Sequence, residues 1–178
     1  MAMKRMPHEI IRDLSSEYDK LSDSKVLAKL RDIPALPDED DPAWDQAFWS
    51  DIAYPYLALC GVSCARGLRK AIPLILDRIC FGDPGETMRG MCHVFEGIVK
   101  PNWFELTPYC VAALSSKRPG TRLWAAHQLA RLRDPASLSE LEAVANDPVP
   151  RVRECIEMAL ESTCEASRNA KPPKKRKS

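Results

Sequence analysis

One stretch near the C-terminus recurs along the chain and constrains the fold more than any other feature. It runs from Asp147 to Leu160 and opens with the turn sequence Asp-Pro-Val-Pro. Proline suits the first turn of a helix, so Pro150 predicts where a helix begins. The apolar residues that follow are spaced as on one face of a helix. They are Val152, Cys155, Ile156, Ala159 and Leu160.

The same pattern returns at shifts of 31 and 64 residues. The first shift aligns Arg153 with Arg122, and the second aligns Asp147 with Asp83. A helical period of 31 to 33 residues is typical of a stacked solenoid. Shorter helices are predicted between the recurring ones, over Ile72–Ile79, Leu106–Leu114 and Asp134–Val144, with Thr107 as an N-cap.

The motif D-P-x-P-x-V-R, followed by apolar pairs, resembles a HEAT repeat. The resemblance covers residues 66–164 and implies an α-solenoid of antiparallel helix pairs, without implying one activity. We therefore predict an all-α protein, a short HEAT-like solenoid of about five helix hairpins. A single domain is expected over residues 1–164, with an irregular N-terminal capping part over residues 7–65.

Arginine recurs at one position of each repeat, and an aspartate precedes two of these arginines. The set comprises Asp83, Arg89, Arg122, Asp147 and Arg153. In HEAT-like repeats the equivalent residues form an Asp–Arg ladder between neighbouring repeats, so the resemblance implies a structural role at the repeat turns. A row of arginines could also bind phosphate. Ser116 replaces the acid of the middle unit, which predicts a missing rung there.

The composition narrows the functional class. No apolar run approaches the length of a membrane span, and the segment from Met1 to Pro7 lacks the apolar core of a secretory signal, so we expect a cytoplasmic protein without a membrane partner. The seven cysteines are odd in number and fall mostly at apolar helix positions, which favours reduced core residues over disulfides or a metal site. His93 and His127 have no nucleophile at helical spacing. We therefore expect neither enzymatic activity nor a cofactor.

The net charge of +1 conceals an acidic body and a basic tail. Residues 168–178 carry six basic residues and no acid, which leaves 20 basic and 25 acidic residues in the remainder. Residues 165–178 are predicted to form a disordered tail. Its run Lys174-Lys175-Arg176-Lys177 resembles a nuclear localisation signal and, equally, a nucleic-acid-binding arm. Because the body is acidic, nucleic acid is the less favoured partner.

One segment combines acidic residues with large aromatic ones and contains no lysine or arginine. Its candidate partner-binding residues are Asp38, Glu39, Asp40, Asp41, Trp44, Asp45 and Trp49. Acidic side chains attract a basic partner over long range, and a buried aromatic side chain can anchor it. Core packing is the alternative role for the aromatic residues. The segment therefore predicts a surface for another protein, and that protein is expected to be basic.

Small HEAT-like proteins include bacterial immunity proteins that neutralise a cognate toxin, often a basic nuclease. The resemblance thus implies a non-catalytic inhibitor as the leading function. Other HEAT-like proteins are DNA glycosylases with tryptophans and an aspartate at the lesion, a set that Trp44, Asp45 and Trp49 could mimic. A generic scaffold or adaptor and a bilin-lyase-like protein are further alternatives.

Overall fold

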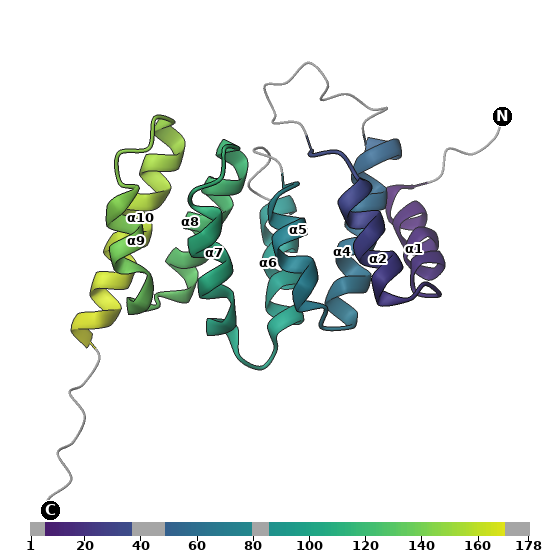
Figure 1. Ribbon diagram of the computed structural model, residues 1–178, viewed down its shortest axis with the longest axis horizontal. Coiled ribbons are helices and arrows are strands. Elements are labelled where there is room, and N and C mark those ends of the chain that lie inside the picture. The colour runs from purple at the N-terminus through teal and green to yellow at the C-terminus, as the bar shows by residue number, and fades with distance from the viewer. Residues whose placement is uncertain (1–5, 37–48, 80–85, 170–178) are drawn as a thin grey trace, which may run out of the picture.

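The computed structural model describes residues 6–36, 49–79 and 86–169. Every regular element in these ranges is helical, which confirms the predicted all-α class. The helices follow one another along the long axis of the molecule, from α1 at one end to α9 and α10 at the other (Figure 1). This serial arrangement is that of a short α-solenoid.

The helices form two layers. The first layer contains α2 (Asp23–Asp32), α5 (Ile72–Leu76), α7 (Thr107–Ala113) and α9 (Leu138–Ala143). The second contains α1 (Pro7–Tyr18), α4 (Tyr54–Ala65), α6 (Glu86–Val99), α8 (Pro119–Leu132) and α10 (Pro150–Asn169). Contacts run within each layer, as between α5 and α7 or α8 and α10, and between successive helices such as α7 and α8.

Three of the first-layer helices, α5, α7 and α9, are shorter than the sequence predicts. Each begins with a 3₁₀ turn, at Arg69–Ala71, Trp103–Leu106 and Pro135–Ser137. Thr107 does not cap α7: the N-cap position belongs to Leu106, and the Thr107 hydroxyl donates to Asp134 Oδ2 at 2.7 Å. The hydroxyl therefore joins two neighbouring hairpins instead of closing its own helix.

The N-terminal part forms a cap on the solenoid, in which α1 packs against α4. The described helices thus form four hairpins plus one covering helix. A π-helical segment, Trp49–Ala53, leads directly into α4. Pro55 lies in the first turn of α4, directly after the π-helical segment.

The core runs between the layers, and its largest fully buried side chain is Trp124. Its ring meets that of Phe95 edge to face, at a centroid distance of 6.4 Å, which joins α8 to α6. Helix α6 also packs closely on α4: a Cβ built at Gly97 would lie 2.3 Å from Cys64 Sγ. Glycine at this position lets the two helices approach.

The last helix is longer than predicted. Helix α10 continues through residues 165–169, so the expected boundary of the tail at residue 164 is too early. Small and hydroxylated residues end the helix, with Thr163 buried and Ser167 Oγ donating to Thr163 O at 3.0 Å. Their low hydrophobicity hides the continuation from an apolar pattern. Among the described residues, no helix combines the length and apolar character that a bilayer crossing requires.

Candidate functional site

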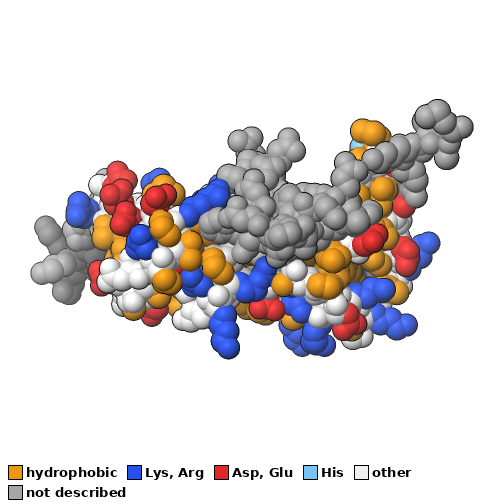
Figure 2. Space-filling view, turned by 90° about the horizontal axis from the view of Figure 1, so that it is seen from above, with side chains coloured by type: hydrophobic (Ala, Val, Ile, Leu, Met, Phe, Trp, Pro, Cys, Tyr) orange, Lys and Arg blue, Asp and Glu red, His pale blue; other side chains and the backbone are white. Residues whose placement is uncertain are grey.

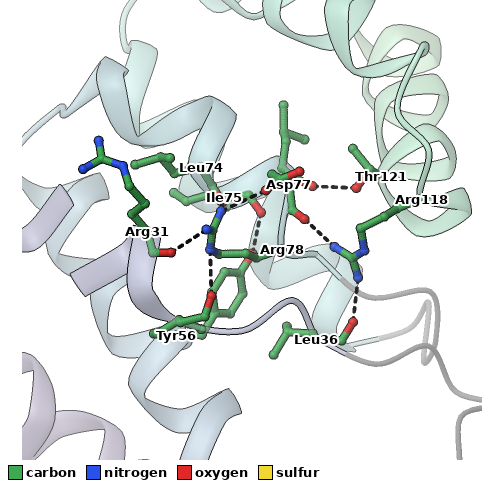
Figure 3. Close-up of polar contacts among 11 residues, drawn as sticks. Arg31, Leu36, Tyr56, Leu74, Ile75, Asp77, Arg78, Arg118 and Thr121 are labelled. Carbon is green, nitrogen blue, oxygen red and sulfur yellow. Dashed lines mark hydrogen bonds and ion pairs between the residues drawn. The ribbon is translucent and has the colours of Figure 1, made fainter. Parts of the chain in front are cut away.

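Arg78 joins the ends of two first-layer helices. It follows α5, and its guanidinium donates to the carbonyl oxygens of Ile33 at 2.9 Å, Arg31 at 2.7 Å and Leu74 at 3.2 Å (Figure 3). The last carbonyls of a helix lack partners within that helix, and the forked guanidinium can satisfy several of them. With 11% of its side chain exposed, Arg78 holds the end of α2 against the end of α5.

Arg118 makes a second contact of this kind from the start of α8. It donates to the carbonyl of Leu36 at 2.6 Å and to that of Asp77, while the Leu36 N–H donates to Arg78 O at 2.9 Å (Figure 3). Leu36 itself is buried. We call Arg78 and Arg118 together the arginine clamp, because they fix residues 33–36 on the first layer.

Residues 33–36, which the clamp holds, come shortly before the acidic-aromatic segment in the sequence. Asp38, Glu39, Asp40, Asp41, Trp44 and Asp45 lie outside the described residues, and Trp49 is described only as the first residue of the π-helix. The described chain therefore gives the two ends of the segment. One end is Leu36, held by the clamp, and the other leads into α4.

A groove of about 750 Å³ adjoins the clamp between α5 and α7. It is lined by Pro73, Leu76, Asp77, Glu105, Pro108, Tyr109, Ala112, Ala113, Ser115, Ser116 and Thr121. Two of these touch the clamp: the Asp77 backbone carbonyl accepts from the Arg118 guanidinium, and Ser116 Oγ accepts from the Arg118 N–H at 3.2 Å. Most of the lining is apolar, and among the described residues its charged members are Asp77 and Glu105, both paired with an arginine. Arg78 donates to Asp77 Oδ2 at 3.1 Å. Arg69 donates to Glu105 at 2.5 Å, and this contact lowers the pKa of the Glu105 carboxyl.

The repeat turns of the last two hairpins are joined by an ion pair. Arg122 donates to both carboxylate oxygens of Asp147, at 2.6 and 3.0 Å, and Arg153 donates to the Asp147 backbone oxygen at 2.6 Å. The hydrogen bond from Arg122 lowers the pKa of Asp147. Asp83 and the side chain of Arg89 lie outside the described residues.

Ser116 takes over part of the role of Asp147 in the middle turn. Its Oγ accepts from the Arg118 N–H at 3.2 Å, just as Asp147 Oδ1 accepts from the Val149 N–H at 2.9 Å. Each side chain thus closes its turn two residues ahead. The serine offers no charge to an arginine of the preceding repeat, but its carbonyl accepts from Arg122 at 2.9 Å.

Asp134 is a repeat-joining residue that the sequence analysis did not single out. Its side chain accepts from the Ala136 N–H at 3.1 Å and from the Thr107 hydroxyl. The Asp134-Pro135 dipeptide repeats the Asp147-Pro148 turn signal, and an aspartate before proline at a helix start is a capping signal that could have identified it.

The described titratable residues do not converge on a reaction centre. His93 is exposed beside Glu96, at 3.6 Å, whereas desolvation lowers the pKa of the partly buried His127. No group of three His, Cys, Asp or Glu side chains within the described ranges could hold a metal ion. Burial raises the pKa of the Cys110 thiol to about 12 and that of Cys155 to about 11, which keeps both protonated at neutral pH.

Comparison with known proteins agrees with the architecture. Residues 99–161, which span α7 to α10, match the family described as HEAT repeats. The match covers 63 of the 178 residues, so the likeness to HEAT repeats is shown for this part of the chain. No curated protein and no solved structure matches the chain. HEAT repeats suggest a protein-interaction scaffold, and members of the family are typically non-catalytic.

Proposed function

We propose that this protein is a non-catalytic, cytoplasmic inhibitor that binds a basic protein, in the manner of an immunity protein that neutralises a toxin domain. The binding surface combines the groove between α5 and α7 with the acidic-aromatic segment. One observation carries the proposal: Arg118 of the clamp donates both to Leu36, the last described residue before the segment, and to Asp77, which lines the mostly apolar groove.

Each part of this surface contributes a different term to binding. Acidic side chains raise the association rate of a basic partner through long-range attraction. An apolar groove slows dissociation once a partner side chain is buried in it. The arginine clamp also contributes. A segment that starts from a fixed Leu36 has less conformational freedom to lose on binding.

Nucleic acid fits this surface less well. The body of the chain carries more acidic than basic residues. Where Figure 2 shows described residues, lysine, arginine and carboxylate side chains are interspersed with hydrophobic ones, and that part of the face carries no continuous basic stripe of the kind typical of a nucleic-acid groove. Salt-sensitive binding to duplex DNA would instead favour the glycosylase-like alternative.

The proposal is tested first on association kinetics. The partner is captured from the source cell, identified by mass spectrometry and expressed, and its binding is followed by stopped-flow. Replacing Asp38, Glu39, Asp40 and Asp41 by serine should slow association about tenfold at low salt. The difference should shrink near 0.5 M salt, where the Debye length falls to about 4 Å.

A matched control removes the same charge elsewhere. Glu140, Glu142, Glu154 and Glu157 are exposed on α9 and α10, and replacing them by serine should change association much less. Equal slowing by both quadruple variants would mean that net charge alone steers the partner. Trp44→Ala or Trp49→Ala should act mainly on dissociation, at about 2 kcal/mol if either side chain is an anchor.

The groove is tested by adding a cation to it. Ala112 is exposed and lines the groove, so Ala112→Arg should weaken binding of a basic partner through both bulk and charge. Ala143→Arg places the same side chain on the exposed part of α9 and serves as the control. Unchanged affinity for Ala112→Arg would remove the groove from the interface.

A further inference from the structure

A second hollow lies on the other layer of the solenoid. It occupies about 570 Å³ between α6, α8 and α10. Its lining residues are Glu96, Trp103, Leu106, His127, Gln128, Ala130, Arg131, Leu132, Arg133, Met158 and Ser162. None of these lines the groove between α5 and α7, so the two hollows are separate surfaces.

Two large apolar side chains at the second hollow are exposed to solvent. Trp103 is 55% exposed and Met158 is 54% exposed, although they come from elements more than 50 residues apart. Phe104, next to Trp103, is 57% exposed. These three account for all but one of the exposed large hydrophobic residues in the described chain. Tryptophan and methionine are enriched at protein interfaces, and their convergence on one hollow indicates a contact site.

The charge at this hollow is cationic. Arg131 donates to Glu96, so the one carboxylate of the lining is already neutralised. Arg133 is exposed, and no described carboxylate forms an ion pair with it. It also adopts the left-handed conformation, with φ of 52°, at the end of α8. Glycine is the usual residue at such a helix end, because a side chain there strains the backbone. An arginine at this position therefore presents its charge at a cost in stability.

We propose that the second hollow binds an acidic, amphipathic segment of another protein. An apolar side chain of that segment would contact Trp103 and Met158, and an adjacent carboxylate would pair with Arg133. This partner differs in charge from the basic protein proposed for the first layer. A chain with both surfaces acts as an adaptor that can hold two partners at once, one on each layer.

The test uses a displayed library of random short peptides, selected for binding to the full-length protein. Each selected peptide is then tested on two variants: Trp103→Ala removes the exposed apolar contact, and Arg133→Gly removes the charge. The second is informative because glycine relieves the left-handed strain, so this variant should melt no lower than the wild type and a loss of binding cannot be attributed to unfolding. Arg133→Lys, which keeps a positive charge, is the matched control.

Peptides that bind the wild type more tightly than they bind either variant should carry Asp or Glu beside Leu, Phe, Trp or Met. By fluorescence anisotropy their affinity should fall about tenfold for Trp103→Ala and about threefold for Arg133→Gly. Arg133→Lys should retain most of the affinity. The variant in which Asp38, Glu39, Asp40 and Asp41 are replaced by serine should bind these peptides with wild-type affinity. This result would separate the present proposal from the function proposed above.

Three results would overturn the inference. The selected peptides could be basic or lack enrichment, or they could bind both variants as tightly as the wild type. Sedimentation could also show a wild-type dimer that Trp103→Ala converts to a monomer, which would make a second copy of the chain the occupant of the hollow.

Discussion

Arg122 and Asp147 form a two-point ion pair across 25 residues of sequence, with Nε to Oδ2 at 2.6 Å and Nη2 to Oδ1 at 3.0 Å. Only 12% of the arginine side chain and 5% of the aspartate side chain are exposed. Solvent screens such a pair weakly, and its bidentate geometry satisfies both groups. The first turn of α8 is thereby fixed to the turn before α10.

Breaking this pair should destabilise the fold. Arg122→Ala leaves the Asp147 carboxylate buried without its main partner, and Asp147→Asn does the same to the guanidinium. We expect each to lower the free energy of unfolding by about 1–3 kcal/mol in urea denaturation. The exposed Arg12, whose contact with Asp13 is solvent-screened, gives the control: Arg12→Ala should change stability by less than about 0.5 kcal/mol. Wild-type stability for both core variants would mean that the pair contributes little.

The same pair predicts a dependence of stability on pH. The pKa of Asp147 is lower in the folded protein than in the unfolded chain, so the unfolded chain takes up the proton first as the pH falls. The stabilisation is complete well above the unfolded value of about 4 and is lost as the pH falls through the folded value. Urea denaturation should therefore show a wild-type advantage over Asp147→Asn that is constant near neutral pH and shrinks below about pH 4. An advantage unchanged from pH 7 to pH 3 would contradict this assignment.

Gly97 offers a test of helix packing that separates steric from conformational effects. Gly97→Ala places a Cβ 2.3 Å from Cys64 Sγ and should destabilise the protein by about 1–3 kcal/mol, measured by thermal or urea denaturation. Removing the sulfur should rescue it, because the next atom, Cys64 Cβ, lies at 3.8 Å. The double variant Gly97→Ala, Cys64→Ala should match or exceed Cys64→Ala alone, since alanine is favoured over glycine within a helix by about 0.5–1 kcal/mol. A double variant as unstable as Gly97→Ala would locate the strain elsewhere.

The thiols should differ widely in reactivity. Cys110 and Cys155 are buried with raised pKa values, and burial also raises the pKa of Cys60. Because the thiolate is the reactive form, these three should be modified by an aromatic disulfide reagent at pH 8 only when the protein unfolds. Cys164, which is partly exposed, should react in the native state. Mass mapping on a Cys80→Ser background measures each site, and uniform labelling in the native protein would contradict the burial.

The repeat architecture was accessible from the sequence because it rests on periodic signals. Helices α8 and α10 begin at Pro119 and Pro150, as the 31-residue shift predicts. The first-layer helices were harder, since their 3₁₀ starts carry no hydrophobic period of their own. Thr107 is an example. A threonine at a helix start suggests an N-cap, but in the structure its hydroxyl donates to Asp134 of the next hairpin, a contact that the local sequence does not reveal.

The arginine clamp and both hollows could not be predicted in this way. Arg78 and Arg118 donate mainly to backbone carbonyls, and every residue has such a carbonyl, so no residue pattern marks the acceptor. The hollows depend on how adjacent hairpins are offset. Trp103 and Met158 line one hollow only because α10 packs on α8.

The bond from Arg118 to the Leu36 carbonyl also bears on how the chain is made. It spans 82 residues, whereas most contacts of a solenoid join neighbouring hairpins. During synthesis on the ribosome, α1 and α2 can form as soon as they emerge, but the last hold on residues 33–36 has to wait until the start of α8 has been translated and has left the exit tunnel. The base of the segment that we propose to face the partner is thus completed only after the start of α8 has been made, and a nascent chain stopped before Arg118 would lack this contact.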